Sequence, residues 1–180
     1  IAAFKMAFVE NSGPLLLIKS QNGHLLKEDL ALITHAIEGR TDIVHVDQHV
    51  DEETQASYLQ CADVLVSLHR SEGLGLHILE ALLRRVPVLS TAFSAPTEFL
   101  DSAYSALVDY ALVPVKNGNG VYPTGYLWAQ PDVQHAAHLM RKLSSNSVYL
   151  NDLKKGTTAV QKHLVSEKEA GLKLASWLFE

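Results

Sequence analysis

The apolar residues of the chain alternate between continuous runs and helix-like spacing. Five short runs stand out: LLLI (15–18), DIVHV (42–46), DVLVSL (63–68), VPVLS (86–90) and SALVDY (105–110). Runs of this length without regular polar alternation are typical of strands buried on both faces of a parallel sheet. Between them, apolar residues recur three or four positions apart, as in Leu26, Leu30, Ile33 and Ile37, which is the spacing of an amphipathic helix.

Several residues mark where the expected helices begin and end. Gly39 stands where a left-handed helix C-cap belongs, and Asp51 precedes two glutamates that favour a helix start. Asp132 is the expected cap of a helix whose apolar face holds Val133, Ala136, Ala137 and Met140. Two further helices are expected: one in AAFKMAFVE near the start, and a last one capped by Ser166 and Glu169 and ending LASWLFE.

The strand–helix rhythm stops after residue 110. Segment 111–132, ALVPVKNGNGVYPTGYLWAQPD, is rich in glycine and proline, so we expect a long irregular loop, of the kind that is usually functional or pinned to a neighbour. Tyr126 and Trp128 are read as packing anchors of this loop rather than a platform for a sugar ring.

Strands alternating with helices predict an α/β fold, a Rossmann-like doubly wound parallel sheet with extra C-terminal helices. The chain has 180 residues, so we expect one domain, 1–180. Folds of this class bind ligands at the carboxyl ends of their strands.

Composition excludes several classes of protein. The net charge of −5 argues against a nucleic-acid partner, which needs a basic face, and the apolar runs are too short to span a bilayer. One cysteine, Cys61, excludes an intramolecular disulfide, fits the cytosol, and is expected to be buried. The histidine pairs 45/49 and 135/138 lack a cysteine or carboxylate at metal-ligand spacing, so no metal site is expected. The chain shows no signal peptide and begins at Ile1, which we read as the mark of a partial protein.

The stretch LHRSEGLGLHILE (68–80) joins the third run to a helix. The first N–H groups of that helix favour an anion such as phosphate, and glycines at 73 and 75 allow a ligand to approach the backbone. Glu80 offers two acceptor oxygens for vicinal hydroxyls. Spacing alone leaves a second interpretation open, in which Glu72 and Glu80 are solvated charges around a turn.

The run CADVLVSLHRSEGLGLHILEALLRRVPVLSTAFSAPTEFL (61–100) strongly resembles the donor-binding half of retaining glycosyltransferases of family 4, which have the GT-B fold. Segments downstream resemble members that act in bacterial surface-polysaccharide synthesis. The resemblance implies a UDP-sugar or GDP-sugar donor and transfer with no metal or other cofactor. Glu72 is implied as the catalytic residue, on hydroxyls of the donor sugar, and Glu80 as the ligand of the ribose. Further donor-binding residues are Gly73, Gly75, Leu76, His77, His69 and Arg70, and the nucleobase lies along Val46, Asp47 and Gln48.

His69 and Arg70 flank the motif at the end of the strand. A second interpretation stays open for them, in which they form a surface contact and do not bind the donor. The resemblance also has gaps. The family's domain opens with a strand and a Gly-rich loop whose Arg and Lys clamp the diphosphate, and this sequence matches only after that point; Lys19 does not match the clamp lysine. The N-terminal acceptor-binding domain is not matched either, so the fragment alone is expected to be inactive.

Three substitutions depart from the family pattern: Arg85 and Ala95–Pro96 replace small residues, and Gln130 replaces a glutamate. Pro96 removes a backbone donor near the sugar. The expected location is the cytoplasm, with peripheral contact at the inner face of the membrane. The alternative function is a diverged, non-catalytic domain that binds nucleotide or a protein partner.

Overall fold

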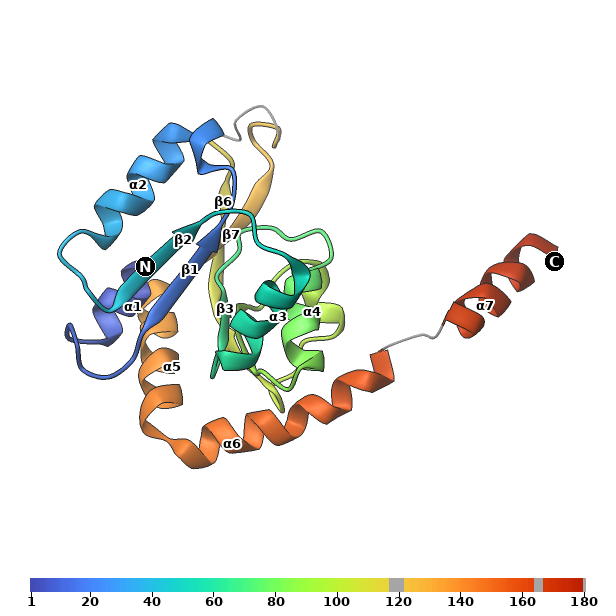
Figure 1. The fold of residues 1–180 in the computed structure, drawn as a ribbon. Helices are drawn as coiled ribbons and strands as arrows, with labels where there is room; N and C mark the ends of the chain where they lie inside the picture. The colour runs from blue at the N-terminus through green and yellow to red at the C-terminus, as the bar shows by residue number, and fades with distance from the viewer. Residues whose placement is uncertain (117–121, 164–166, 180) are drawn as a thin grey trace.

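The computed structural model describes residues 1–116, 122–163 and 167–179. Parallel strands form two sheets (Figure 1): β1 (Leu16–Ser20) pairs with β2 (Ile43–Asp47), and a second sheet has the order β3 (Leu65–Ser67), β4 (Val88–Thr91), β5 (Ser105–Val108). An antiparallel pair follows, β6 (Tyr110–Pro114) with β7 (Leu127–Pro131).

Helices connect and follow the strands. Those within the α/β part are α1 (Ala2–Ala7), η1 (Gly23–Leu25), α2 (Lys27–Ile37), α3 (Glu52–Cys61), α4 (Leu76–Leu83) and the 3₁₀ helix η2 (Ala95–Glu98). The C-terminal ones are α5 (Val133–Ser145), α6 (Ser147–Gly156), η3 (Thr157–His163) and α7 (Glu167–Phe179), the last standing away from the body of the molecule in Figure 1.

Two hydrophobic cores lie on the two faces of the three-stranded sheet. On one face, α1 and α5 pack side by side and bury Phe4, Ala137 and Met140 with Leu89 and Val108. On the other face, α4 buries a second cluster, composed of Ile78, Ala81, Leu82, Val86, Val88, Phe99, Tyr104 and Val160. Helices on both faces of parallel strands confirm the doubly wound α/β prediction.

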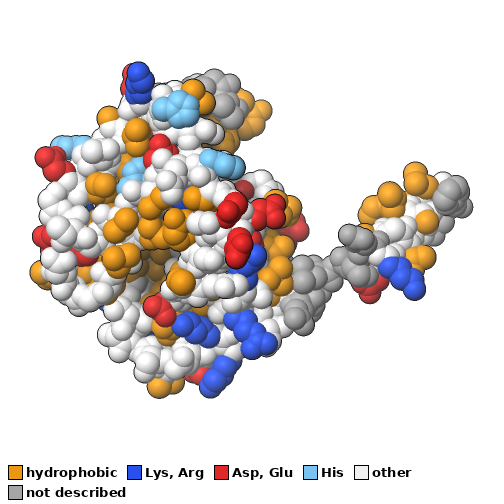
Figure 2. Space-filling view, in the orientation of Figure 1, with side chains coloured by type: hydrophobic (Ala, Val, Ile, Leu, Met, Phe, Trp, Pro, Cys, Tyr) orange, Lys and Arg blue, Asp and Glu red, His pale blue; other side chains and the backbone are white. Residues whose placement is uncertain are grey.

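The parallel strands do not form one continuous sheet. Within the described residues, no hydrogen-bonded ladder joins β1 to β3. The run at 15–18 was expected to be buried on both faces, and this was wrong: Leu15 is 63% exposed, Leu17 is 37% exposed, and its register partner Val44 is 39% exposed. Within the described residues, Leu17 and Val44 leave that side of the strand pair exposed, and Figure 2 shows hydrophobic side chains gathered over these strands.

The predicted irregular loop after residue 110 is instead a β-hairpin. Five residue pairs, from Tyr110↔Pro131 to Pro114↔Leu127, form its ladder. The glycines and prolines that favoured a loop belong mostly to the connection between two β-prone runs, ALV and LWA. The prediction missed the strands that these runs form. Trp128 is half-buried, whereas Tyr126 is 69% exposed and contributes its backbone carbonyl, which accepts from the Val115 N–H at 2.7 Å.

The predicted helix boundaries at three positions are confirmed. The Asp51 carboxylate accepts a hydrogen bond from the Thr54 backbone N–H at 2.8 Å, Asp132 caps α5 in the same way, and Gly39 has a left-handed φ of 74° after α2. The Ser166 capping box lies outside the described residues. Cys61, expected to be buried, is exposed at the end of α3. No helix in the described ranges is long and apolar enough to cross a membrane.

Candidate functional site

The loop between β3 and α4 is shaped by Gly75. This residue caps α4 with φ 78°, and a Cβ built on it would lie 2.8 Å from Pro96 Cγ. Only glycine fits both the backbone angle and the space. Gly73 differs, because a Cβ there would meet nothing within 4 Å.

Glu72 folds its carboxylate back over the turn that Gly75 makes. One oxygen, Oε1, accepts hydrogen bonds from the backbone N–H groups of Gly73 (3.1 Å) and Gly75 (3.2 Å). The Ser94 hydroxyl donates to the Glu72 carbonyl at 2.7 Å and lies 3.3 Å from its N–H. The side chain is 28% exposed, so the second oxygen, Oε2, faces outward from a fixed carboxylate.

Two histidines, His69 and His77, lie within hydrogen-bonding distance of the buried Ser67 hydroxyl. His69 Nε2 lies 2.9 Å from the Phe93 carbonyl and must donate to it, which leaves Nδ1 to accept from the Ser67 hydroxyl at 3.1 Å. His77 Nε2 then donates to Ser67 Oγ at 3.3 Å, and His77 Nδ1 points toward Glu72 Oε2, 4.0 Å away. The chain of contacts fixes the His77 ring beside the carboxylate.

Glu80 lies one turn into α4, three positions after His77 and therefore on the same side of the helix. Its Oε1 accepts from Arg84 Nη1 at 2.9 Å, and its side chain is 36% exposed. Leu76, the first helical residue, is 66% exposed. In the described part of the chain, no hydrogen bond occupies the backbone N–H of Leu76 or His77, so two donors at the start of α4 are available to an anion.

Arg70 turns toward the hairpin, away from the α4 contacts. Its guanidinium lies over the Trp128 ring, 4.8 Å from the centroid, and donates to Gln130 Oε1 at 2.6 Å. The Arg70 carbonyl also accepts from the Ala129 N–H at 2.9 Å.

The ends of β1 and β2 carry a second polar group. Asp47 accepts from the Ser20 hydroxyl at 2.7 Å and from the Gly23 N–H at 3.1 Å. The Ser20 hydrogen bond, aided by Gly23 and nearby histidines, holds the pKa of the Asp47 carboxyl below its usual range. Lys19 donates to the Gln48 carbonyl, and Val46 is half-buried. This end of the strand pair is therefore ordered by its own side chains.

The predicted site residues thus fall into two groups with one outlier. Glu72, Gly73, Gly75, Leu76, His77, Glu80 and His69 surround the start of α4, and Val46, Asp47 and Gln48 end β2. No hydrogen bond or ion pair among the described residues joins the two groups. Sequence reasoning missed Ser67, Arg84 and Ser94. Arg84 could have been found from its spacing to Glu80, but Ser67 and Ser94 gain their roles only from contacts across the fold.

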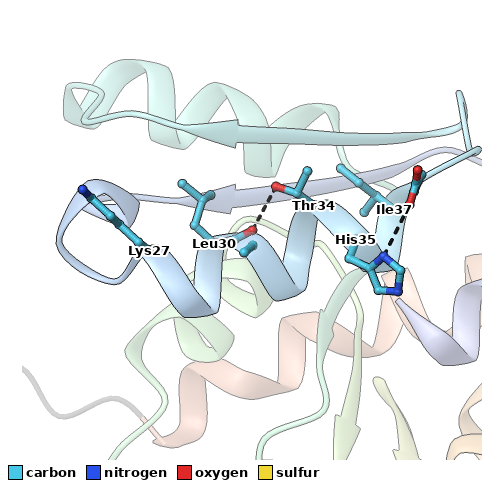
Figure 3. A pocket seen from close by; sticks show the side chains of 7 residues that line it. Lys27, Leu30, Thr34, His35 and Ile37 are labelled. Atoms are coloured by element: carbon cyan, nitrogen blue, oxygen red, sulfur yellow. Dashed lines mark hydrogen bonds and ion pairs between the residues drawn. The ribbon is translucent and has the colours of Figure 1, made fainter.

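A hollow of about 720 Å³ lies along α2, away from the glutamate loop (Figure 3). Its lining residues come from α2 and from Glu38, the residue that follows the helix. His35 lies 3.3 Å from the Glu38 carboxylate, and the Thr34 hydroxyl donates to the Leu30 carbonyl. It holds none of the predicted site residues. Across the residues that the structure describes, no group of three histidine, cysteine or acidic side chains is placed to bind a metal.

Solved structures similar to this chain are glycosyltransferases of the GT-B fold. Sucrose-phosphate synthase from Thermosynechococcus elongatus has a TM-score of 0.62 at 19% identity, over 91% of this chain and 37% of that chain. Anabaena HepE in complex with UDP and glucose has a TM-score of 0.64 at 11% identity, over 91% and 40%. The C-terminal domain of LpcC, a group 1 glycosyl transferase from Francisella tularensis, has a TM-score of 0.55 at 19% identity, over 78% and 63%.

These likenesses confirm the fold, a Rossmann-like half of a GT-B enzyme. The chain spans less than half the length of the first two of these proteins. No curated protein sequence matches it. The profile of one family, Glycosyl transferases group 1, matches residues 30–160, and the chain therefore belongs to that family.

Proposed function

We propose that this chain is the donor-binding part of a retaining family 4 glycosyltransferase and binds a UDP-sugar or a GDP-sugar. The observation that carries the proposal is the start of α4. Two free backbone N–H groups, at Leu76 and His77, lie between two carboxylates, Glu72 and Glu80. A sugar–diphosphate–ribose ligand has hydroxyls, then phosphates, then hydroxyls in the same order.

Each residue then has a chemical role. Glu72 binds the donor-sugar hydroxyls through Oε2, since Oε1 is held by the glycine N–H groups. Glu80 accepts from the ribose hydroxyls, and the Arg84 guanidinium, 2.9 Å away, orients its carboxylate. The α4 N-terminus stabilises the negative charge of the leaving diphosphate as the sugar–phosphate bond breaks. No metal or other cofactor is assigned a step.

The second polar group is proposed to bind the base. Val46, Asp47 and Gln48 end β2, and the Lys19 ammonium fixes the Gln48 carbonyl. Backbone atoms at such a fixed strand end can hydrogen-bond the edge of a uracil or guanine. His69, held by Ser67 and Phe93, supports the donor loop, and Arg70 contacts the hairpin.

We further propose that a strand ahead of α1 completes the domain between β1 and β3. Consecutive parallel strands are joined by right-handed crossovers, so α1 would connect such a strand to the free side of β1. In the part of the chain that the structure describes, β1 pairs only with β2 and β3 only with β4, so each has an edge without a ladder, which supports this. The acceptor-binding domain and the diphosphate clamp belong to the remainder of the protein, and this chain alone is inactive as a transferase. We place the whole enzyme in the cytoplasm, acting in polysaccharide synthesis at the inner face of the membrane.

Calorimetric titration of the chain with UDP, GDP, UDP-glucose and GDP-mannose tests the proposal. We expect one nucleotide series to bind selectively. Glu80→Ala should weaken that binding at least tenfold, because two charge-assisted hydrogen bonds to the ribose are lost. Glu52→Ala, an exposed glutamate at the start of α3, is the matched control and should bind as the parent does. Equal binding by the two variants, or no binding of any nucleotide, contradicts the proposal and favours a diverged domain.

A further inference from the structure

A hollow of about 400 Å³ opens where the hairpin meets the glutamate loop. Its lining is Arg70 from the loop and Val113, Pro114, Lys116 and Trp128 from the hairpin. It is distinct from the start of α4, where the donor is proposed to bind, because it shares no lining residue with that group. Loop and hairpin build it jointly, so its floor is fixed by both elements.

Three contacts hold Arg70 in place at this junction. All three partners belong to one strand, β7. The Arg70 carbonyl accepts from the Ala129 N–H, and its guanidinium donates to Gln130 Oε1 and lies over the Trp128 ring. Tyr122 also contacts Trp128, with ring centroids 5.9 Å apart in an edge-to-face arrangement. The guanidinium and the indole are therefore preorganised before any ligand arrives.

The charge of the hollow is positive in a chain whose net charge is −5. Arg70 and Lys116 are its charged lining residues, and no carboxylate lines it. Within the described residues, neither cation forms an ion pair. Gln130, the one side-chain acceptor on Arg70, is neutral. Two unneutralised cations beside an indole and two apolar side chains suit a ligand that is anionic at one end and a ring at the other.

We propose that this hollow is a subsite for the anionic group of a charged sugar, a carboxylate or a phosphate on a pyranose ring. Arg70 and Lys116 bind the anion, and Trp128, Val113 and Pro114 contact the ring. That the ligand is a sugar rests on the proposed function, whereas the preference for an anion rests on the hollow itself. Arg70 precedes Glu72 by two positions in the same loop, so the subsite and the proposed donor site are built on one loop.

Trp128 allows the binding to be measured directly. The chain has two tryptophans, so Trp177→Phe on α7 leaves Trp128 as the single indole reporter. This protein is titrated with glucuronate, glucose 6-phosphate and neutral glucose at constant ionic strength. We expect a saturable change of Trp128 emission with at least one anionic sugar and none with glucose. The arm that responds identifies the anion as carboxylate or phosphate.

Lys116→Ala should weaken the response roughly tenfold, since one charge-assisted contact is lost. Lys116 is exposed, so its removal leaves the fold intact, which circular dichroism confirms. Lys155→Ala on α6 is the matched charge control and should respond as the parent does. Glu80→Ala should also leave the response unchanged, which separates this subsite from the nucleotide site. Three outcomes would overturn the proposal: no change of Trp128 emission with any anionic sugar, the same change with glucose, or a change that Lys116→Ala leaves intact.

Discussion

Positive φ angles mark both borders of α4. Gly75 precedes the helix with φ 78°, and Arg85 follows it with φ 63°. Across the loop, Ser94 has φ 68° and ψ −166°, a region in which residues other than glycine are strained. Its hydroxyl contacts both backbone groups of Glu72. Strain at Ser94 is therefore coupled to the position of the candidate catalytic carboxylate.

Two glycines of the motif should respond differently to the same change. Gly75→Ala places a Cβ 2.8 Å from Pro96 Cγ in a left-handed conformation, so we expect a loss of at least about 1 kcal/mol in unfolding free energy. Gly73→Ala meets open space and should stay within about 0.5 kcal/mol of the parent. Urea denaturation measures both. Equal losses in the two variants would show that the turn is not shaped by Gly75.

The hairpin is the element that the sequence predicted least well. Strands β1 to β5 and helices α2 to α5 follow from local apolar patterns, which is why their existence and the Asp51 and Asp132 caps were predicted. The hairpin pairs residues that are 13 positions apart at its inner end and 21 at its outer end. A glycine-rich connection separates them, and the position of the hairpin depends on Arg70, forty positions or more away. The separation of β1 and β3 into two sheets could not be predicted either, because the order of strands in a sheet depends on contacts between distant parts of the chain. The histidine–serine contacts at the site were missed for the same reason.

The contact between hairpin and loop can be strengthened by one substitution. Gln130→Glu gives Arg70 a carboxylate partner at a position now 2.6 Å away. We expect about 0.5–1 kcal/mol more stability, as for a well-oriented exposed ion pair. The gain should vanish in Arg70→Ala, so a double-mutant cycle of thermal unfolding separates it from a local effect of the glutamate. A gain that persists without Arg70 would mean that the pair does not form.

At the scale of the molecule, a buried carboxylate that is hydrogen-bonded to its neighbours links separate parts of the fold. Arg40 and Asp42 form a bidentate pair, at 2.7 and 2.6 Å, just before β2. Asp42 also accepts from the Asn11 N–H, and Arg40 lies over the Phe4 ring. The pair therefore ties α1 and the segment after it to the β1–β2 sheet. The Arg40 hydrogen bonds hold the pKa of the Asp42 carboxyl below its usual range.

Stability should fall in acid because several carboxyl pKa values are lowered in the folded state. These are the carboxyls of Glu10, bonded by the Thr41 N–H, of Asp42, of Asp47, and of Asp51, bonded by Thr54. Above their unfolded values, near pH 4, the stabilisation is fully present, and it is lost as pH falls through the folded values. Thermal unfolding from pH 7 to pH 2 measures the slope. Asp42→Asn should be less stable at neutral pH and show a shallower slope; an unchanged slope contradicts the role of the pair.

Among the described strands, β1 and β3 each have one edge without a ladder, and this has a consequence for the chain in a cell. Open strand edges next to exposed leucine and valine side chains, here Leu17 and Val44, are what chaperones and proteases recognise in an unfinished protein. A free copy with this surface would be bound, refolded or degraded, whereas a copy with the edges covered would persist. Quality control would then favour copies of the chain in which these strand edges are covered.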